Sequence, residues 1–396
     1  MEPREGLKLP HRHGTKSADK EATLQVPVAL TAALARATQM AGMLAIGHVF
    51  PHHNPVAEEE PLAGLVAWDS LWFQAIARYG YSVPQTVAFL PGMPLLFRHV
   101  PQCVLVLAWP VLAGLTAMLQ QDVMSKIGWR TEHATSLSTA LLSSFTPASA
   151  HFSALYSETP FAFLSTLCVW CSLHIEDSVH PTRWISLSAL LSVAASLFRS
   201  NGLLLFGFVA CGVLRMKGTK PGMWLRWIIV ALLGLCVLSP VHFHLLAACR
   251  RLGIDTNWWE LLPGYGQVQG RFWDVGFMRY YKPKNTMRFL LMLPSLAAWT
   301  AGLWRLLCGT CRGGGALSTE MVLKPFLLPW TVIVSVHALV QMLVCLTCAN
   351  VEILPRLLWA SSPVIVSELV PKWGALVLMG QGVLGQWLFA LHYAYT

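Results

Sequence analysis

The chain has 396 residues, of which 55% are hydrophobic and only 12% charged, and its mean hydropathy is +0.53. Soluble domains carry roughly 25% charged residues and could not bury so much apolar surface, so the composition predicts an all-α protein that crosses a membrane several times. The net charge of +9 comes from short Lys and Arg clusters between apolar runs, with no basic face interleaved with stacking aromatics, which excludes a nucleic-acid-binding protein.

Residues 1–25 are polar and basic, and we predict a disordered cytoplasmic tail. No small-residue cleavage site follows a short apolar core, so we expect no cleavable signal peptide and a first span that acts as a signal anchor. That span runs from about Val26 to Phe50. It contains Arg36, which must extend to the membrane surface or face the helix bundle, because a charge exposed to lipid is costly.

Ten further apolar runs follow, several shorter than the ~20 residues that a helix needs to cross the hydrocarbon. They cover residues 102–119, 134–156, 159–175, 184–198, 203–214, 227–248, 286–307, 326–348, 357–370 and 375–395. We predict eight to eleven spans, preferably eleven, in a single transmembrane domain over residues 26–396. The runs 184–198 and 203–214 fit one long span, a re-entrant hairpin or two tilted helices.

Lys and Arg in the short connections orient the bundle, because positive residues accumulate in cytoplasmic loops. Clusters near Lys126, Lys217 and Arg312 mark cytoplasmic turns, which places the loops of about 51–101 and 249–285 on the lumenal side. The second loop is itself strongly basic. We interpret that charge as a sign of anionic ligands rather than of a cytoplasmic location.

Ten cysteines include three C-x-x-C pairs, at 168/171, 308/311 and 345/348. Zinc needs four ligands that converge on one point, whereas these pairs lie on separate predicted helices. Cysteine inside an apolar helix is usually a small core residue. The sequence therefore predicts no metal site.

One carboxylate stands out in the first lumenal loop. Residues 68–81 read WDSLWFQAIARYGY and residues 88–94 read AFLPGMP, so Asp69 lies in an aromatic segment beyond the first span. A carboxylate among aromatics at a membrane surface is costly unless it has a task. The structural alternative is an interfacial helix anchored by Trp68, Trp72 and Tyr81, with Asp69 as its N-terminal carboxylate.

The pattern W-D-x-x-x-F-x-x-I-A-x-x-G-Y, followed by A-F-x-P-x-x-P, resembles the first lumenal loop of the GPI mannosyltransferase 2 family. Members of that family add the second mannose during glycosylphosphatidylinositol (GPI) anchor assembly. Four more segments resemble the family in the same order: FTPASAHFSALYSETP at 145–160, SLFRSNG at 196–202, FWDVGFMRYY at 272–281 and VEILPRLLWASSP at 351–363. The resemblance therefore extends over most of the chain.

The second and third segments each have a structural alternative. Glu158 follows Ser157 and is also explained as a helix-start carboxylate that meets the helix dipole. Arg199 precedes Asn201 and Gly202, which suit an interfacial turn whether or not the arginine binds phosphate. An Arg near hydrocarbon costs about 2.5–3.5 kcal/mol on insertion scales, so it should find an anion or water.

The last two segments depart from the family at one position each. Asp274 stands where the family often has Asn, so it is assigned no specific role, and the neighbouring Trp273 also fits an aromatic helix lying on the membrane. Pro355 stands where the family has Thr. Arg356 is a second candidate phosphate partner, or else a helix-start arginine that extends to the membrane surface.

The resemblance implies a glycosyltransferase of the GT-C class: a polytopic transmembrane helix bundle with lumenal loop helices in the endoplasmic reticulum (ER) membrane. It implies inverting transfer of an α-1,6 mannose from dolichyl-phosphate mannose to the GPI precursor glycolipid at a lumenal active site. Asp69 would be the general base. The substrate-binding residues would be Trp68, Glu158, Arg199, Asn201, Trp273 and Arg356. No metal and no cofactor besides the lipid donor are expected.

The chemistry of such a transfer needs only these groups. Inversion at the anomeric carbon requires one carboxylate that takes the proton of the acceptor hydroxyl. The leaving phosphate is already stable as an anion, so cationic stabilisation replaces the second carboxylic acid of glycoside hydrolysis. One Asp and Arg donors suffice, and the sequence contains no P-loop.

Two other classes of function remain open. A lipid or solute transporter would also be polytopic with intramembrane charges, but would usually show repeats and broken helices in both halves, and neither is visible. A non-catalytic subunit of a GPI-assembly complex could keep the site residues for structural reasons. The sequence also leaves open whether a small accessory membrane subunit is required.

Overall fold

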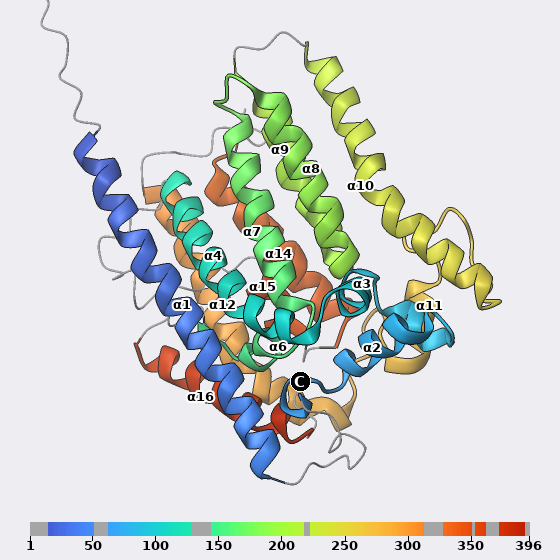
Figure 1. Cartoon of the computed structure of the whole chain (residues 1–396). Helices are drawn as coiled ribbons and strands as arrows, with labels where there is room; N and C mark the ends of the chain where they lie inside the picture. The colour runs from blue at the N-terminus through green and yellow to red at the C-terminus, as the bar shows by residue number, and fades with distance from the viewer. Residues whose placement is uncertain are drawn as a thin grey trace, which may run out of the picture.

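The computed structural model describes residues 15–50, 62–127, 144–217, 222–312, 328–350, 353–361 and 372–392. Within these ranges the chain is helical and has no strand, as the composition predicted. Figure 1 shows the long helices side by side in a bundle, with α2, α3 and α11 gathered toward one end.

The bundle helices are α1 (Thr15–Val49), α4 (Gln102–Lys126), α7 (Glu158–Ile175), α8 (Pro181–Phe198), α9 (Phe206–Arg215), α10 (Met223–Arg251), α12 (Thr286–Arg312), α14 (Trp330–Cys348) and α16 (Lys372–Ala390). The short helices are α2 (Asp69–Tyr79), α3 (Gly92–His99), α6 (Ser149–Ser153), α11 (Tyr265–Trp273) and α15 (Leu354–Ser361). The 3-10 turns are η2 (Ala63–Leu65), η3 (Pro84–Ala88), η4 (Ser200–Leu205) and η5 (Pro283–Asn285).

Four helical segments of the described chain are long and apolar enough to cross a membrane. They are Gln25–Val49, Gln102–Lys126, Met223–Arg251 and Trp330–Cys348. Shorter apolar helices accompany them, at Ser200–Arg215 and Val377–Ala390. The protein is therefore an all-α, polytopic membrane protein.

Two predicted segments differ from the structure. Helix α1 already begins at Thr15, so part of the predicted polar tail is helical, whereas residues 1–14 lie outside the described residues. Residues 134–143 of the predicted span 134–156 lie outside the described residues. From Phe145 to Tyr156 the chain forms irregular backbone on both sides of the five-residue helix α6. Pro147 explains the interruption, because proline disfavours helical backbone at the preceding residue.

The chain reverses direction between α8 and α9, which identifies 184–198 and 203–214 as two helices of a hairpin. Arg199 has extended backbone, and η4 then folds back against α8. Gly202 permits this close return, because a Cβ atom there would lie 2.5 Å from the backbone nitrogen of Ser196. The hairpin places Arg199 at the end of the bundle where α2, α3 and α11 lie, which is called the loop end below.

Arg36 in α1 faces the bundle and is only 3% exposed. Its Nη1 donates hydrogen bonds to Ser153 Oγ over 2.9 Å, to the Ser149 carbonyl oxygen over 3.2 Å and to Gln39 Oε1 over 3.0 Å. These contacts tie α1 to α6. Of the two alternatives that the sequence left open, the structure therefore shows the buried one.

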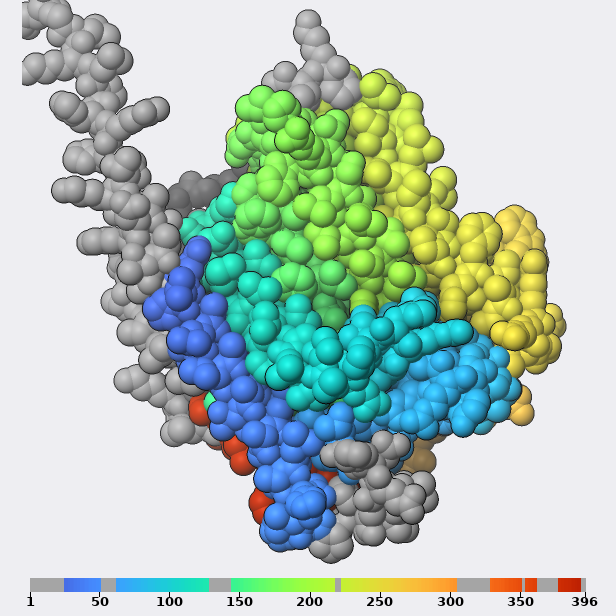
Figure 2. Space-filling model, viewed as in Figure 1, coloured from blue at the N-terminus to red at the C-terminus, as the bar shows by residue number. Residues whose placement is uncertain are grey.

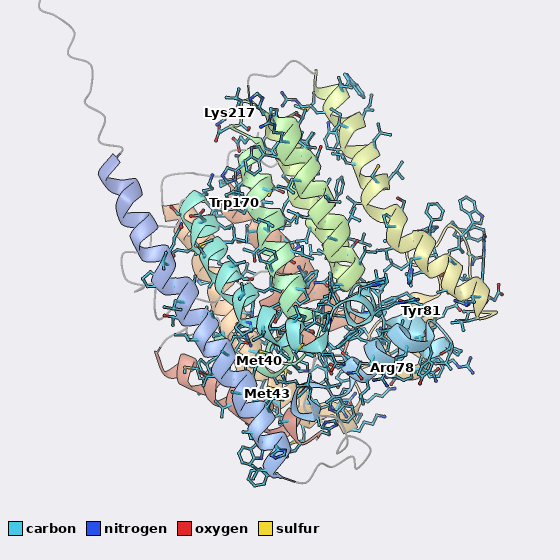
Figure 3. The ribbon with its side chains drawn as sticks, viewed as in Figure 1. Met40, Met43, Arg78, Tyr81, Trp170 and Lys217 are labelled. Carbon is cyan, nitrogen blue, oxygen red and sulfur yellow. The ribbon has the colours of Figure 1, made fainter. Side chains whose placement is uncertain are left out.

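Helix α7 forms the centre of the bundle and packs against α4, α8, α9 and α15. Phe161, Cys168 and Cys171 are fully buried in this core. The helix begins at Glu158, and Glu176 follows its last residue, so one carboxylate marks each end. Lys217, which pairs with Glu176, lies at the opposite end from Arg78 and Tyr81 (Figure 3).

The two predicted lumenal loops pack against each other. Val87 and Leu90 from the first loop share a buried cluster with Leu245 and Val268, from the end of α10 and from α11. Figure 2 shows the same contact at the surface, where the light-blue segment of the first loop meets the yellow end of α10. Both loops therefore lie at the same end of the bundle.

Candidate active site

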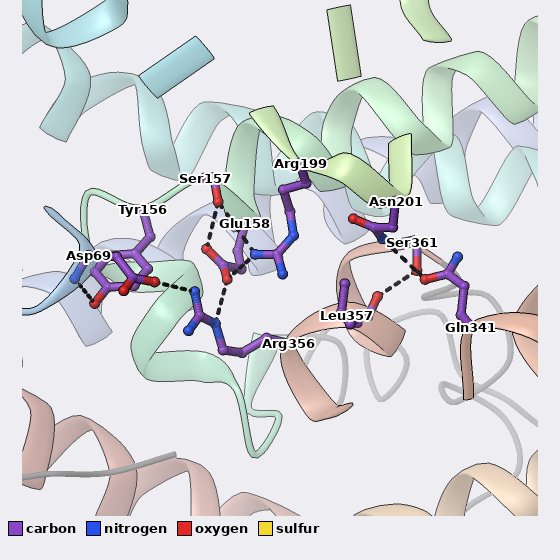
Figure 4. Close-up of polar contacts among 10 residues, drawn as sticks. All are labelled: Asp69, Tyr156, Ser157, Glu158, Arg199, Asn201, Gln341, Arg356, Leu357 and Ser361. Atoms are coloured by element: carbon purple, nitrogen blue, oxygen red, sulfur yellow. Dashed lines mark hydrogen bonds and ion pairs between the residues drawn. The ribbon is translucent and has the colours of Figure 1, made fainter. Parts of the chain in front are cut away.

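Two carboxylates and two arginines meet at the loop end of the bundle (Figure 4). Arg356 lies between the carboxylates: its Nη2 donates to Asp69 Oδ2 over 2.8 Å and its Nε donates to Glu158 Oε1 over 2.6 Å. Arg199 Nη1 donates to the same oxygen of Glu158. Four of the predicted site residues, far apart in the sequence, are thus in direct contact.

Each of the four side chains comes from the end of a helix. Asp69 and Glu158 are the first residues of α2 and α7, Arg199 directly follows α8, and Arg356 is in the first turn of α15. A carboxylate is favoured at a helix start, where the helix dipole is positive. The helix-start alternative is therefore structurally correct for both carboxylates, and it coexists with their contacts to the arginines.

Exposure differs strongly along the cluster. The Glu158 side chain is 0% exposed, those of Arg199 and Arg356 are 11% and 13% exposed, and that of Asp69 is 31% exposed. Glu158 therefore lies behind the arginines and positions them, whereas Asp69 faces the outside. Among the described residues, no hydrogen-bond partner is found for Asp69 Oδ1, so this oxygen is available to a ligand.

The electrostatics of the cluster follow from its burial. Glu158 lies outside the four candidate spans. Burial alone would raise the pKa of Glu158, but the guanidinium groups of Arg356 and Arg199 reverse this and hold the pKa below its usual range. Glu158 is therefore ionised, and the two carboxylates balance the two guanidinium groups.

The backbone before Asp69 is in an unusual conformation. Trp68 has a φ of 48° and a ψ of −107°, although it is not glycine. A bulky residue at positive φ is a genuine outlier, and such strain costs about 1–3 kcal/mol and clusters at functional sites. The Trp68 side chain is exposed, although it is large and hydrophobic. It therefore stands beside Asp69 where a ligand could contact it.

The strained segment is held against α1 by a close backbone contact. Gly64 in η2 packs so tightly that a Cβ atom there would lie 2.2 Å from the Met43 carbonyl oxygen. Gly47 lies one helical turn further along α1, and a Cβ atom there would lie 2.8 Å from the Gly64 Cα atom. Only glycine allows this approach, which fixes the path of the chain into Asp69.

Asn201 belongs to a second polar group beside the ion pairs (Figure 4). Its Nδ2 donates to Gln341 Oε1 over 3.1 Å, and the Ser361 hydroxyl donates to the same oxygen over 2.5 Å. The Asn201 Oδ1 atom is buried and has no hydrogen-bond partner within the described chain. Gln341 was not predicted as a site residue, because its only signal in the sequence is a lone Gln in an apolar run.

Trp273, the last residue of α11, lies in an aromatic wall next to α2. Its ring meets Phe89 edge-on at 5.8 Å, and Phe89 stacks on Trp72 at 5.7 Å. The alternative of an aromatic helix holds only up to Trp273, because Asp274 ends α11 in the left-handed conformation and pairs with Lys282. Trp273 therefore lies at the end of a helix, where its ring contacts Phe89 of the first loop.

The family described as Mannosyltransferase (PIG-V) matches residues 28–370. GPI mannosyltransferase 2 of Drosophila pseudoobscura is 30% identical and covers 77% of each chain. GPI alpha-1,6-mannosyltransferase 2 of Homo sapiens is 28% identical and covers 77% of this chain and 72% of the relative. No solved structure matches significantly.

We expect Glu158→Gln to lower the free energy of unfolding by about 3–5 kcal/mol, because it leaves two buried guanidinium groups short of a negative charge. Glu176→Gln is the matched control at the other end of α7. The Glu176 side chain is 12% exposed, against 0% for Glu158, and its partner Lys217 is 67% exposed, so water can partly replace the lost carboxylate and the loss should be smaller. Thermal unfolding in detergent measures both variants. An equal or smaller loss for Glu158→Gln would contradict its assigned role.

Proposed function

Because the chain belongs to the mannosyltransferase (PIG-V) family, we propose that it transfers the second mannose, in α-1,6 linkage, from dolichyl-phosphate mannose to the GPI anchor precursor in the ER lumen. The names of the relatives support the acceptor pathway and the linkage. The observation that carries the proposal is the partly exposed Asp69, ion-paired to Arg356, which is only 13% exposed, at one end of a membrane helix bundle.

In the proposed reaction Asp69 is the general base. Its Oδ1 takes the proton of the acceptor hydroxyl, whose oxygen forms a bond to the anomeric carbon of the donor mannose. The bond between that carbon and the phosphate oxygen breaks, and its electron pair leaves with dolichyl phosphate. Attack opposite the leaving group inverts the configuration. The proposed reaction includes no cofactor besides the lipid donor.

Arg356 links two events of this reaction electrostatically: proton uptake by Asp69 and departure of the phosphate. Before transfer, its charge is shared between Asp69 and Glu158. When Asp69 takes up the proton, Arg356 loses one of its anionic partners at the moment when the leaving phosphate gains negative charge. The guanidinium charge then becomes available to the phosphate in a poorly solvated site, where such stabilisation is strong.

The position of the arginines suits a lipid-linked donor. The polyprenyl tail holds the donor in the bilayer, so the phosphate must bind where a membrane helix ends. Arg199 directly follows the apolar helix α8, and its Nε atom is buried without a hydrogen-bond partner in the described structure. Arg199 and Arg356 are therefore proposed to hold the phosphate. Trp68, Asn201 and Trp273 are proposed to contact the sugars.

We expect Asp69→Asn to lower mannose transfer to a one-mannose GPI acceptor by at least about a hundredfold, because the amide keeps the shape but cannot accept the proton. The matched control is Asp274→Asn, since Asp274 is an exposed carboxylate paired with Lys282 in another segment that matches the family. That variant should transfer at the wild-type rate. Microsomes from cells that lack the endogenous enzyme give the measurement, normalised to protein level. Near-normal transfer by Asp69→Asn would reject the general-base role.

Lysine substitutions distinguish the roles of Arg199 and Arg356. Arg356 uses two nitrogens to reach two carboxylates, a fork that lysine cannot reproduce, so Arg356→Lys should lower kcat by about tenfold or more. Arg199 contacts Glu158 and Ser157 through Nη1 alone. Arg199→Lys should therefore keep that contact and mainly raise the KM for the lipid donor. If both variants match the wild type at every donor concentration, these arginines have no role in donor binding.

A labelling experiment tests the proposed topology. Single cysteines replace the exposed residues Ser82 and Asp255, one in each of the two packed loops, in a chain without native cysteines. Both should be shielded from an impermeant thiol reagent in sealed microsomes and react after permeabilisation. A cysteine at Lys217, at the opposite end of the bundle, is the control and should react at once (Figure 3). Immediate labelling at position 82 or 255 would overturn a lumenal site.

A further inference from the structure

Tyr156 is a buried residue whose hydroxyl meets the backbone on both sides of the strained Trp68. The Asp69 N–H donates to the Tyr156 hydroxyl oxygen over 2.9 Å, and the same hydroxyl donates to the Ala67 carbonyl oxygen over 3.0 Å. One side-chain oxygen thus satisfies the backbone groups that flank Trp68. Figure 4 shows Tyr156 directly beside Asp69.

The ring of Tyr156 is itself held in place. It lies edge-on to Phe73, His151 and Phe389, with ring centroids 5.4–6.2 Å apart. The Arg356 guanidinium carbon lies 5.2 Å from the ring centroid. Burial raises the pKa of Tyr156 well above its ordinary value, so the phenol keeps its proton and remains a donor to Ala67. The packing of the ring therefore fixes the position of the hydroxyl, which can in turn hold the neighbouring backbone in one conformation.

We propose that Tyr156 is a positioning residue for Asp69, on the premise that Asp69 is the general base proposed above. Its hydroxyl holds Trp68 at positive φ and thereby fixes where α2 starts and where the Asp69 carboxylate lies relative to Arg356. A bulky residue does not adopt this backbone unless the surroundings determine it. A misplacement of about 1 Å can lower turnover by up to a hundredfold.

Tyr156→Phe tests this role, because it keeps the ring and removes only the hydroxyl. We expect kcat for mannose transfer to fall by about tenfold or more, with the KM for the lipid donor within about twofold of wild type. The peptide covering residues 66–72 should exchange its amide hydrogens faster, since the Asp69 N–H loses its partner. Ser70→Ala is the matched control: it removes another hydroxyl, bonded to the Leu155 carbonyl over 2.9 Å, that joins the same two segments without touching the Trp68 backbone.

The outcomes separate this role from the proposed function. Unchanged amide exchange in Tyr156→Phe, or faster exchange with wild-type kcat, would overturn the positioning role, as would an equal fall of kcat in Ser70→Ala. Near-normal transfer by Asp69→Asn would reject the general base and, with it, any effect on turnover of positioning Asp69 through Tyr156. Faster amide exchange in Tyr156→Phe would still show that the hydroxyl holds this backbone.

A second experiment tests the same role by melting temperature, in case Tyr156→Phe folds too poorly for kinetic measurements. Glycine adopts positive φ without strain, so in a Trp68→Gly background the loss of the Tyr156 hydroxyl should lower the melting temperature less than it does with Trp68 present. An equal loss in both backgrounds would show that the hydroxyl does not hold the strained backbone.

Discussion

The architecture of the site depends on the neutralisation of one fully buried carboxylate, Glu158. An unpaired charge at that depth is strongly unfavourable, and it becomes tolerable only with excellent geometry and charged partners. The partners are Arg199 and Arg356, which come from the ends of α8 and α15. The ends of two helices, α8 and α15, must therefore converge on the start of α7, and this convergence creates the site.

The same requirement divides the cluster into a fixed part and a reactive part. Glu158 and the arginines are nearly enclosed, whereas Asp69 is 31% exposed and has one oxygen left for a ligand. The loop segment that carries Asp69 is independently fixed, through the Gly64 contact with α1 and the Tyr156 hydroxyl. The carboxylate that would exchange a proton thus lies at the exposed edge of a rigid arrangement, as proton transfer to a substrate hydroxyl demands.

Composition and motifs were sufficient to predict the helical membrane class and the four residues that meet in the ion-pair cluster. They were insufficient where structure depends on contacts between distant segments. No local pattern indicates that Trp68 takes positive φ, because that backbone is stabilised by Tyr156 from a remote segment. Gln341 was overlooked because a single Gln in an apolar helix is ambiguous until Asn201 is seen beside it. The run 134–156 was apolar enough for a span, but in its described part, residues 144–156, the apolar side chains are buried around irregular backbone and the short helix α6.

The charge balance of the cluster has a consequence for the proposed catalysis. Within the ion-pair cluster the two carboxylates and two guanidinium groups balance, so the arginines meet the donor phosphate with their charge already shared with carboxylates. A surplus of positive charge within the cluster arises only when Asp69 is protonated, which coincides with the development of charge on the leaving phosphate. Interactions that strengthen in the transition state raise kcat, whereas those present equally in the ground state do not. A cluster with an additional fixed cation would bind the donor more tightly but would lose part of this selectivity for the transition state.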